Sequence, residues 1–252
     1  MTHSLFLSNF QDACRTSRCP FCVLSEQDTK HYVSTLLHEY TLAPDIHVHL
    51  LRSKGLCARH ASLLVETAEG QHMGGLGVAT LYENLLQDLV EQLQALATDQ
   101  PRVRPPRNAK QGWPLGAALE PQETCLVCVH EAQNEHFVAR ELVEDVAENG
   151  DTGGMAAAYM RSAGACIPHL RLLVQYCRDA AVVEWLGRVQ ERCLVELFRR
   201  LRSCIQSYDA SGPEASEGDR SAWRDVVEAV SGSKMLAPWL QGQAQDRKAL
   251  NK

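Results

Sequence analysis

Two pairs of short cysteine and histidine motifs are the part of this sequence that can carry chemistry. Each pair consists of a CxxC followed, after a similar length of chain, by a CxxH. The residues are Cys19, Cys22, Cys57 and His60 in the first half and Cys125, Cys128, Cys166 and His169 in the second half. Three thiolates and one imidazole make a soft four-donor set, which is typical of a closed tetrahedral Zn²⁺ site. The sequence therefore predicts two metal sites, each built from the motifs of its own half.

The spacing within each motif suits convergence on one ion. A CxxC in a tight turn brings two thiolates together, and a CxxH in the first turn of a helix places its two donors on one face. That position lies near the positive end of the helix dipole, which favours thiolate over thiol. Gly55 and Gly164 each precede the CxxH by two residues and would permit a sharp entry into the helix. The arrangement resembles the knuckle and helix of treble-clef zinc sites.

The predicted sites need a nearby positive charge. A Zn²⁺ ion with three thiolates and one neutral imidazole carries a net charge of about −1, so a cation is expected close to each site. The candidates are Arg52, Arg59 and Arg161.

An iron–sulfur cluster held by the same eight residues is the alternative to zinc. Cys14, Cys19 and Cys22 form a C-x₄-C-x₂-C run like that of plant-type ferredoxins. The second half has no cysteine at the position that corresponds to Cys14, so we interpret Cys14 as a spare thiol. A catalytic zinc is disfavoured because four protein donors leave no open coordination position.

The remaining cysteines and histidines are not expected to bind metal or take part in catalysis. Cys177, Cys193 and Cys204 lie in helical segments and are expected to be small buried apolar residues. The histidines outside the motifs include His47, His49 and His72, which we expect to be solvated or hydrogen-bonded rather than part of a third site.

The two halves also agree outside the metal-binding residues. The segment 52–57, Arg-Ser-Lys-Gly-Leu-Cys, corresponds to the segment 161–166, Arg-Ser-Ala-Gly-Ala-Cys. An apolar run follows each CxxH, at 63–65 and at 172–174. These correspondences predict an internal duplication.

Apolar residues recur with the period of a helix over most of the chain, and runs typical of strands are almost absent. Residues 1–18 are interpreted as an approach segment. The expected helices cover residues 25–40, 57–68, 78–96, 132–148, 166 onward, 181–208 and 223–230. We predict a mainly α fold of two pseudo-repeated helical modules, each organised by one metal site, with a C-terminal tail.

Composition suggests the domain boundaries. Residues 1–97 form the first metal-binding half and residues 122–208 the second. The stretch 98–121 is rich in proline and is interpreted as an extended linker, while residues 209–252 form a polar break and tail.

Length and charge exclude several classes of protein. The chain has 252 residues, of which 45% are hydrophobic and 22% charged, as in a globular protein. The net charge of −6 and the lack of a basic run disfavour nucleic acid as a partner. No apolar stretch is long enough to span a membrane, and no secretory signal is visible. Ten cysteines in metal-type spacing then predict a cytoplasmic protein, where thiols stay reduced.

The sequence resembles a bacterial family classed as a domain of unknown function, number 6062. The resemblance rests on the first CxxC with its proline, on Pro44-Asp45 and on the Gly-x-Cys-x-x-His segments at 55–60 and 164–169. It covers nearly the whole chain. The second CxxC lacks a proline, and His47 stands where a basic residue is expected. The resemblance implies paired metal sites and no particular activity.

These observations favour a non-catalytic protein in which two structural zinc ions hold a helical scaffold that binds a protein partner or a small molecule. The alternative is an iron–sulfur protein or enzyme with its substrate between the halves. A third hypothesis is a thiol switch, in which oxidation releases zinc. The sequence names no substrate or partner, and it leaves open whether the protein is an enzyme.

Overall fold

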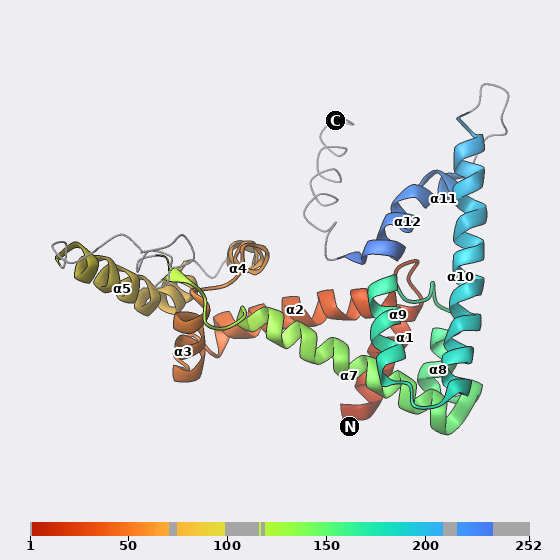
Figure 1. The fold of residues 1–252 in the computed structure, drawn as a ribbon, viewed down its shortest axis with the longest axis horizontal. Helices are drawn as coiled ribbons and strands as arrows, with labels where there is room; N and C mark the ends of the chain where they lie inside the picture. The colour runs from red at the N-terminus through yellow and green to blue at the C-terminus, as the bar shows by residue number, and fades with distance from the viewer. Residues whose placement is uncertain (1, 71–74, 99–115, 117–118, 209–215, 234–252) are drawn as a thin grey trace, which may run out of the picture. The chain divides into compact units, whose positions relative to one another are not determined.

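The structure is a computed structural model that describes residues 2–70, 75–98, 116, 119–208 and 216–233. Within these residues every regular element is helical, which confirms the predicted mainly α class (Figure 1). The elements with the longest ranges are α2, α5, α7 and α10. In chain order the helices are α1 (Thr2–Cys14), α2 (Pro20–His38), α3 (Pro44–Ser53), α4 (Ala58–Gly70), α5 (Leu76–Thr98), α7 (Leu126–Asn149), the 3₁₀ turn η2 (Gly150–Thr152), α8 (Gly154–Tyr159), α9 (Ile167–Tyr176), α10 (Ala180–Gln206), α11 (Glu217–Arg220) and α12 (Ala222–Ser231).

The chain forms two compact units. Unit 1 contains residues Met1–Glu26 and Asn134–Lys252, and unit 2 contains residues Gln27–Gln133. The division falls inside α2 and inside α7, so each of these helices contributes to both units. The units are therefore composed differently from the halves 1–97 and 122–208 that composition suggests.

Unit 2 is built from the C-terminal part of α2, the start of α7 and the helices between them. In this unit α5 packs against α3 and α4. Val33, Leu36 and Leu37 recur at helical spacing on α2 and are buried. They share a core with apolar residues of the other helices, namely Leu50, Leu64, Ala68, Leu81, Leu126 and Val127.

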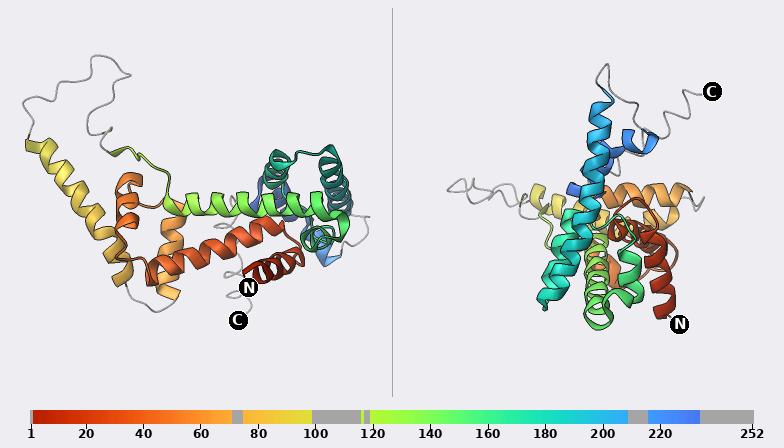
Figure 2. Two further views of the ribbon diagram at one scale, coloured as in Figure 1. Left: turned by 90° about the horizontal axis from the view of Figure 1, so that it is seen from below. Right: turned by 90° about the vertical axis from the view of Figure 1, so that its right-hand side faces the viewer.

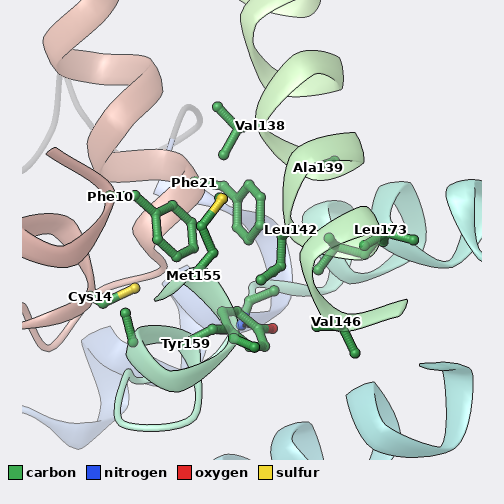
Figure 3. Close-up of a cluster of buried hydrophobic side chains, with 14 of the residues drawn as sticks. Phe10, Cys14, Phe21, Val138, Ala139, Leu142, Val146, Met155, Tyr159 and Leu173 are labelled. Atoms are coloured by element: carbon green, nitrogen blue, oxygen red, sulfur yellow. Dashed lines mark hydrogen bonds between the residues drawn. The ribbon is translucent and has the colours of Figure 1, made fainter. Parts of the chain in front are cut away.

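Unit 1 has the larger core. Here α1 packs against α8, and α12 packs against both α9 and α10. Figure 3 shows Phe10, Phe21 and Leu142 gathered around Met155. Phe21 meets both Phe10 and Tyr159 edge to face, with ring centroids 6.1 Å and 6.2 Å apart. Such pairs add to the free energy gained by burying the rings.

The long amphipathic helices match their predicted ranges. The segments predicted at 57–68, 78–96, 181–208 and 223–230 correspond to α4, α5, α10 and α12, and Figure 2 shows α10 as one uninterrupted helix. The interpretation of residues 1–18 as an approach segment named no helix there, whereas Thr2–Cys14 form α1. Three short helices, α3, α8 and α11, were also missed.

The starts of two helices lie well before their predicted positions. The prediction placed these starts at 25 and 132, whereas α2 begins at Pro20 and α7 at Leu126. Both helices thus begin inside a CxxC motif, which matters for the metal-binding residues.

Parts of the predicted domain organisation lie outside the described residues. These parts are most of the proposed linker at 98–121 and much of the proposed tail at 209–252. The linker and the tail stay predictions. Among the helices of the described ranges, none is long and apolar enough to cross a membrane.

Replacing a core leucine of unit 1 should destabilise the protein strongly. Leu142 is fully buried, so Leu142→Ala should lower the free energy of unfolding by about 2–5 kcal/mol through lost apolar burial and a residual cavity. Leu5 lies in the same unit and is 66% exposed, so Leu5→Ala should change the free energy of unfolding by no more than about 0.5 kcal/mol. Urea denaturation of the two full-length variants measures both values. Equal destabilisation would contradict this core.

Candidate metal centres

The eight predicted residues gather into two tetrads, one in each unit. Within each tetrad the four donor atoms all lie within 4.8 Å of one another. Unit 1 holds Cys19, Cys22, Cys166 and His169, whereas unit 2 holds Cys57, His60, Cys125 and Cys128.

The predicted pairing of motifs was therefore wrong. We expected each CxxC to join the CxxH of its own half, but each joins the CxxH of the other half. The chain passes from unit 1 into unit 2 along α2, which begins at the first CxxC. Helices α3 and α4 follow α2 within unit 2, so Cys57 and His60 lie in that unit. The second CxxC, at the start of α7, lies in unit 2 as well.

In each tetrad the histidine presents Nδ1 to the sulfurs. In unit 2 the His60 Nδ1 atom lies 3.4–3.5 Å from the three Sγ atoms. In unit 1 the His169 Nδ1 atom lies 3.0 Å from Cys166 Sγ, 3.4 Å from Cys22 Sγ and 3.6 Å from Cys19 Sγ. One sulfur–sulfur contact in each tetrad is short: Cys22–Cys166 at 3.8 Å and Cys57–Cys128 at 3.7 Å.

All four motifs lie at helix N-termini. The first residue of each motif directly precedes a helix, and the last residue is the third residue of that helix. Correspondingly, the carbonyl oxygens of Cys19, Cys57, Cys125 and Cys166 accept the backbone N–H of the residue four positions later. The prediction of a helical CxxH is confirmed, but the expectation of a tight turn at each CxxC was wrong. Each tetrad thus joins two helix N-termini, where the helix dipole stabilises thiolates.

The loops before the two CxxH motifs use the predicted glycines. Gly55 has φ +92° and Gly164 has φ +78°, values that favour glycine. A side chain at Gly164 would also approach within 3.0 Å of Gln190 Oε1. Both loops therefore need glycine to turn into the following helix.

A tyrosine hydroxyl accepts the backbone N–H directly before each CxxH cysteine. In unit 2 the Leu56 N–H donates to Tyr82 at 3.3 Å, and in unit 1 the Ala165 N–H donates to Tyr159 at 3.0 Å. The amide of Gln190, which is buried, also bonds both backbone groups of Ala165. These contacts fix the backbone that presents Cys57 and Cys166.

Of the three arginines considered as counter-charges, Arg59 lies beside a tetrad. It forms a two-point ion pair with Glu131, whose carboxylate faces His60. Arg52 instead pairs with Glu123 at 3.0 Å. Arg161 acts electrostatically on the thiol of Cys14, which lies outside the tetrads.

Two carboxylates that were not predicted from the sequence face the histidines. Glu131 Oε2 lies 3.4 Å from His60 Nε2, and Glu135 Oε1 lies 3.4 Å from His169 Nε2. Glu131 follows Cys128 by three residues, a helical spacing. This signal would have been visible if α7 had been predicted to begin at the CxxC.

The unit 2 tetrad combines a thiolate, a thiol and an imidazolium at neutral pH. Burial alone would lower the pKa of His60, but interactions with Cys125 and Glu131 raise it to about 9. Burial would raise the pKa of Cys125, but His60 and backbone N–H groups lower it to about 6. Burial and the neighbouring thiols raise the pKa of Cys128 to about 12.

The unit 1 tetrad has the same division of charge. Burial would lower the pKa of His169, but interactions with Cys166, Cys22 and Glu135 raise it to about 11. Hydrogen bonds from Cys166 and Cys19 lower the pKa of Cys22. Burial raises the pKa of Cys19 well above its usual value.

The other cysteines stand outside the tetrads, and all ten are free of disulfides. Cys14 and Cys204 are buried, whereas Cys177 and Cys193 are only partly buried, so the expectation of buried apolar residues holds for Cys204 alone among the three later cysteines. Burial raises the pKa of Cys14 to about 12, which leaves it a thiol.

The histidines considered for a third site have other partners. His47 Nε2 lies 2.8 Å from the carbonyl oxygen of Thr41, and His49 Nε2 lies 2.8 Å from that of Thr124. The expected hydrogen-bonded role is confirmed for both. His72 lies outside the described residues.

A cavity of about 340 Å³ adjoins the unit 1 tetrad. Cys19, Cys22 and Cys166 line it, and Glu228 of α12 lines it as well. Glu228 pairs with Arg18, which directly precedes Cys19, at 3.2 Å. Helix α12 therefore forms part of the surroundings of this tetrad.

Residues 1–209 match the profile described as a family of unknown function, DUF6062, and the chain belongs to this family. The α11 and α12 helices lie beyond the matched range. No curated protein and no solved structure gives a significant match to the chain. The chemistry of the tetrads thus has to be argued from their own geometry.

Binding of Zn²⁺ at either tetrad should release protons. At pH 7 the raised pKa values keep His60 and Cys128 protonated in unit 2, and His169 and Cys19 in unit 1. Each ion must therefore displace at least one imidazole proton and one thiol proton. Its affinity should fall as the pH is lowered, from about 12 in unit 2 and from at least about 11 in unit 1. Calorimetric titration in buffers of different ionisation enthalpy counts these protons. Binding without proton release would contradict the assigned protonation states.

Proposed function

We propose that each tetrad binds one Zn²⁺ ion and that the two ions stabilise a helical scaffold that binds a protein partner or a small molecule. The spacing of the donor atoms is the observation that carries this proposal. Tetrahedral bonds of about 2.3 Å to sulfur and about 2.0 Å to nitrogen place two sulfurs about 3.8 Å apart and a sulfur and a nitrogen about 3.5 Å apart. Sulfur–sulfur contacts of 3.7 Å and 3.8 Å match the first value, and five of the six sulfur–nitrogen contacts, at 3.4–3.6 Å, match the second. The sixth, Cys166–His169, is shorter at 3.0 Å.

The same spacing favours a single ion over an iron–sulfur cluster. A cluster distributes its protein ligands over several iron atoms, which keeps those ligands further apart than around one ion. Donor atoms that all lie within 4.8 Å of one another suit one central metal. Among single ions, three thiolates and an imidazole in a tetrahedral set favour zinc.

A structural role follows from the number of donors. Four protein donors fill a tetrahedral shell, so a zinc ion here would have no open position for a substrate. Each ion would instead link segments far apart in sequence, such as Cys22 and Cys166 in unit 1. Free thiols throughout support a reducing compartment such as the cytoplasm as the site of action.

The cavity beside the unit 1 tetrad supports the proposal that the scaffold binds a small molecule. Its volume of about 340 Å³ lies at the lower end of the range of small-molecule sites. Its walls combine apolar residues with the Arg200–Asp225 ion pair, at 2.7 Å, so a bound molecule would meet both polar and apolar groups.

We also infer that the two halves arose by duplication. Their CxxH loops share a serine that is buried, a glycine with positive φ and a tyrosine hydroxyl that accepts the N–H before the cysteine. The serines are Ser53 and Ser162.

Elemental analysis of the full chain, purified anaerobically, tests the zinc proposal. We expect a colourless protein with two zinc ions per chain, and a lower melting temperature with less helix after chelation, since structural zinc contributes about 10–16 kcal/mol per site. A coloured protein with iron and acid-labile sulfide, or a metal-free protein with unchanged stability, would refute it.

Single substitutions should remove one zinc at a time. Cys57→Ser should leave about one zinc ion per chain and destabilise unit 2, because it removes a donor from that tetrad. Cys177→Ser is the matched control, because Cys177 lies outside the tetrads and is partly buried. Metal content and thermal unfolding distinguish the two variants, and equal zinc content in both would count against the assigned donors.

A further inference from the structure

The second ring nitrogen of each tetrad histidine faces a carboxylate of α7. Both separations, His60 Nε2 to Glu131 and His169 Nε2 to Glu135, are 3.4 Å, and both are charge contacts. The buried His60 Nε2 has no hydrogen-bond partner among the described residues. His60 is fully buried and Glu131 is 4% exposed. A buried carboxylate is costly unless it is paired, so its position requires an explanation.

Each carboxylate is in turn held by a hydroxyl group of α2. Ser25 donates to Glu135 Oε1 at 2.9 Å in unit 1, and Thr29 donates to Glu131 Oε1 at 3.1 Å in unit 2. Both hydroxyl residues are buried. In unit 2 Arg59 adds a positive charge to the set. The carboxylates are thus oriented within the protein interior.

The carboxylate residues and the hydroxyl residues lie at the same spacings after their CxxC motifs. Glu131 and Glu135 follow Cys128 by three and seven residues, and Ser25 and Thr29 follow Cys22 by three and seven. Positions three and seven residues apart share one face of a helix. One face of α7 therefore supplies both carboxylates, and one face of α2 supplies both hydroxyl groups.

We propose that Glu131 and Glu135 are positioning residues of the two metal sites, and this inference rests on the proposed binding of zinc. An ion bound at Nδ1 requires the proton of the neutral imidazole to stay on Nε2, where the negative charge of the carboxylate, 3.4 Å away, stabilises it. The carboxylate thereby fixes the tautomer and the ring orientation, and it makes Nδ1 a stronger donor. Ser25 and Thr29 act on the metal through the carboxylates.

A purely structural ion pair is the competing explanation, and it predicts a different result. If the carboxylates only joined helices, replacing one would reduce stability without a selective change at one metal site. A positioning role predicts weaker metal binding at the adjacent site and a changed environment of the Nε2 proton.

The test uses Glu131→Gln and Glu135→Gln in the full chain, with Zn²⁺ as the probe. Each variant should lower zinc affinity about 10–100-fold at its own tetrad and leave the other tetrad unchanged, as measured by competition with a chelator. Long-range proton–nitrogen NMR should show Nδ1 bound to zinc and a proton on Nε2 in the wild type, with the Nε2 proton resonance shifted only at the substituted site.

Glu144→Gln is the matched control, because Glu144 lies on the same helix and is exposed, paired with Arg140. If the glutamine variants fail to fold, Ser25→Ala and Thr29→Val test the positioning role instead, since they remove only the hydroxyl donor to each carboxylate. Each should weaken zinc binding at its own tetrad, by a smaller factor than the glutamine variant does.

The outcomes separate the two proposals. If all variants bound zinc as tightly as the wild type and Glu144→Gln do, the positioning role would be overturned and the zinc sites would stand. A wild-type chain that binds no zinc would instead overturn the proposed function itself.

Discussion

The structure depends on the meeting of two helix N-termini at each tetrad. In unit 1 these are the starts of α2 and α9, and in unit 2 the starts of α4 and α7. Each helix start carries about half a positive elementary charge, so two of them side by side repel one another unless negative charge lies between them. Thiolates at these positions supply that charge, and a bound ion would hold the thiolates together. The cysteines therefore determine which helices can meet, in addition to serving as donors.

The remaining contacts keep this junction in place. Phe21, within the first CxxC, stacks on the His169 ring with centroids 5.4 Å apart and joins the tetrad to the unit 1 core. Tyr159 belongs to that core and also accepts the N–H before Cys166. Apolar packing and donor geometry thus share residues, so loss of either should weaken the other. In unit 2, Tyr82 makes the equivalent connection from α5 to the loop before Cys57.

Much of the site could be predicted from the sequence, because the types and spacing of its donors are strongly restrictive. All eight residues occupy the tetrads. Their pairing could not be predicted, since a CxxC from either half offers the same donors to either CxxH. The pairing follows from which helices start in the same unit: α2 and α9 start in unit 1, and α4 and α7 start in unit 2. Both α2 and α7 begin earlier than apolar periodicity indicated. For the same reason Glu131 and Glu135 were missed, since they share a helix face with Cys128 only once α7 begins at Leu126.

The exchanged pairing is the central claim, and cadmium-113 NMR of the fully loaded chain tests it most directly. Each tetrad should give one resonance in the range of three sulfur ligands and one nitrogen ligand. Cys22→Ser and Cys166→Ser should both alter one resonance, whereas Cys57→Ser and Cys125→Ser should both alter the other. If Cys22→Ser and Cys57→Ser altered the same resonance, each half would hold its own ion and this account would be contradicted.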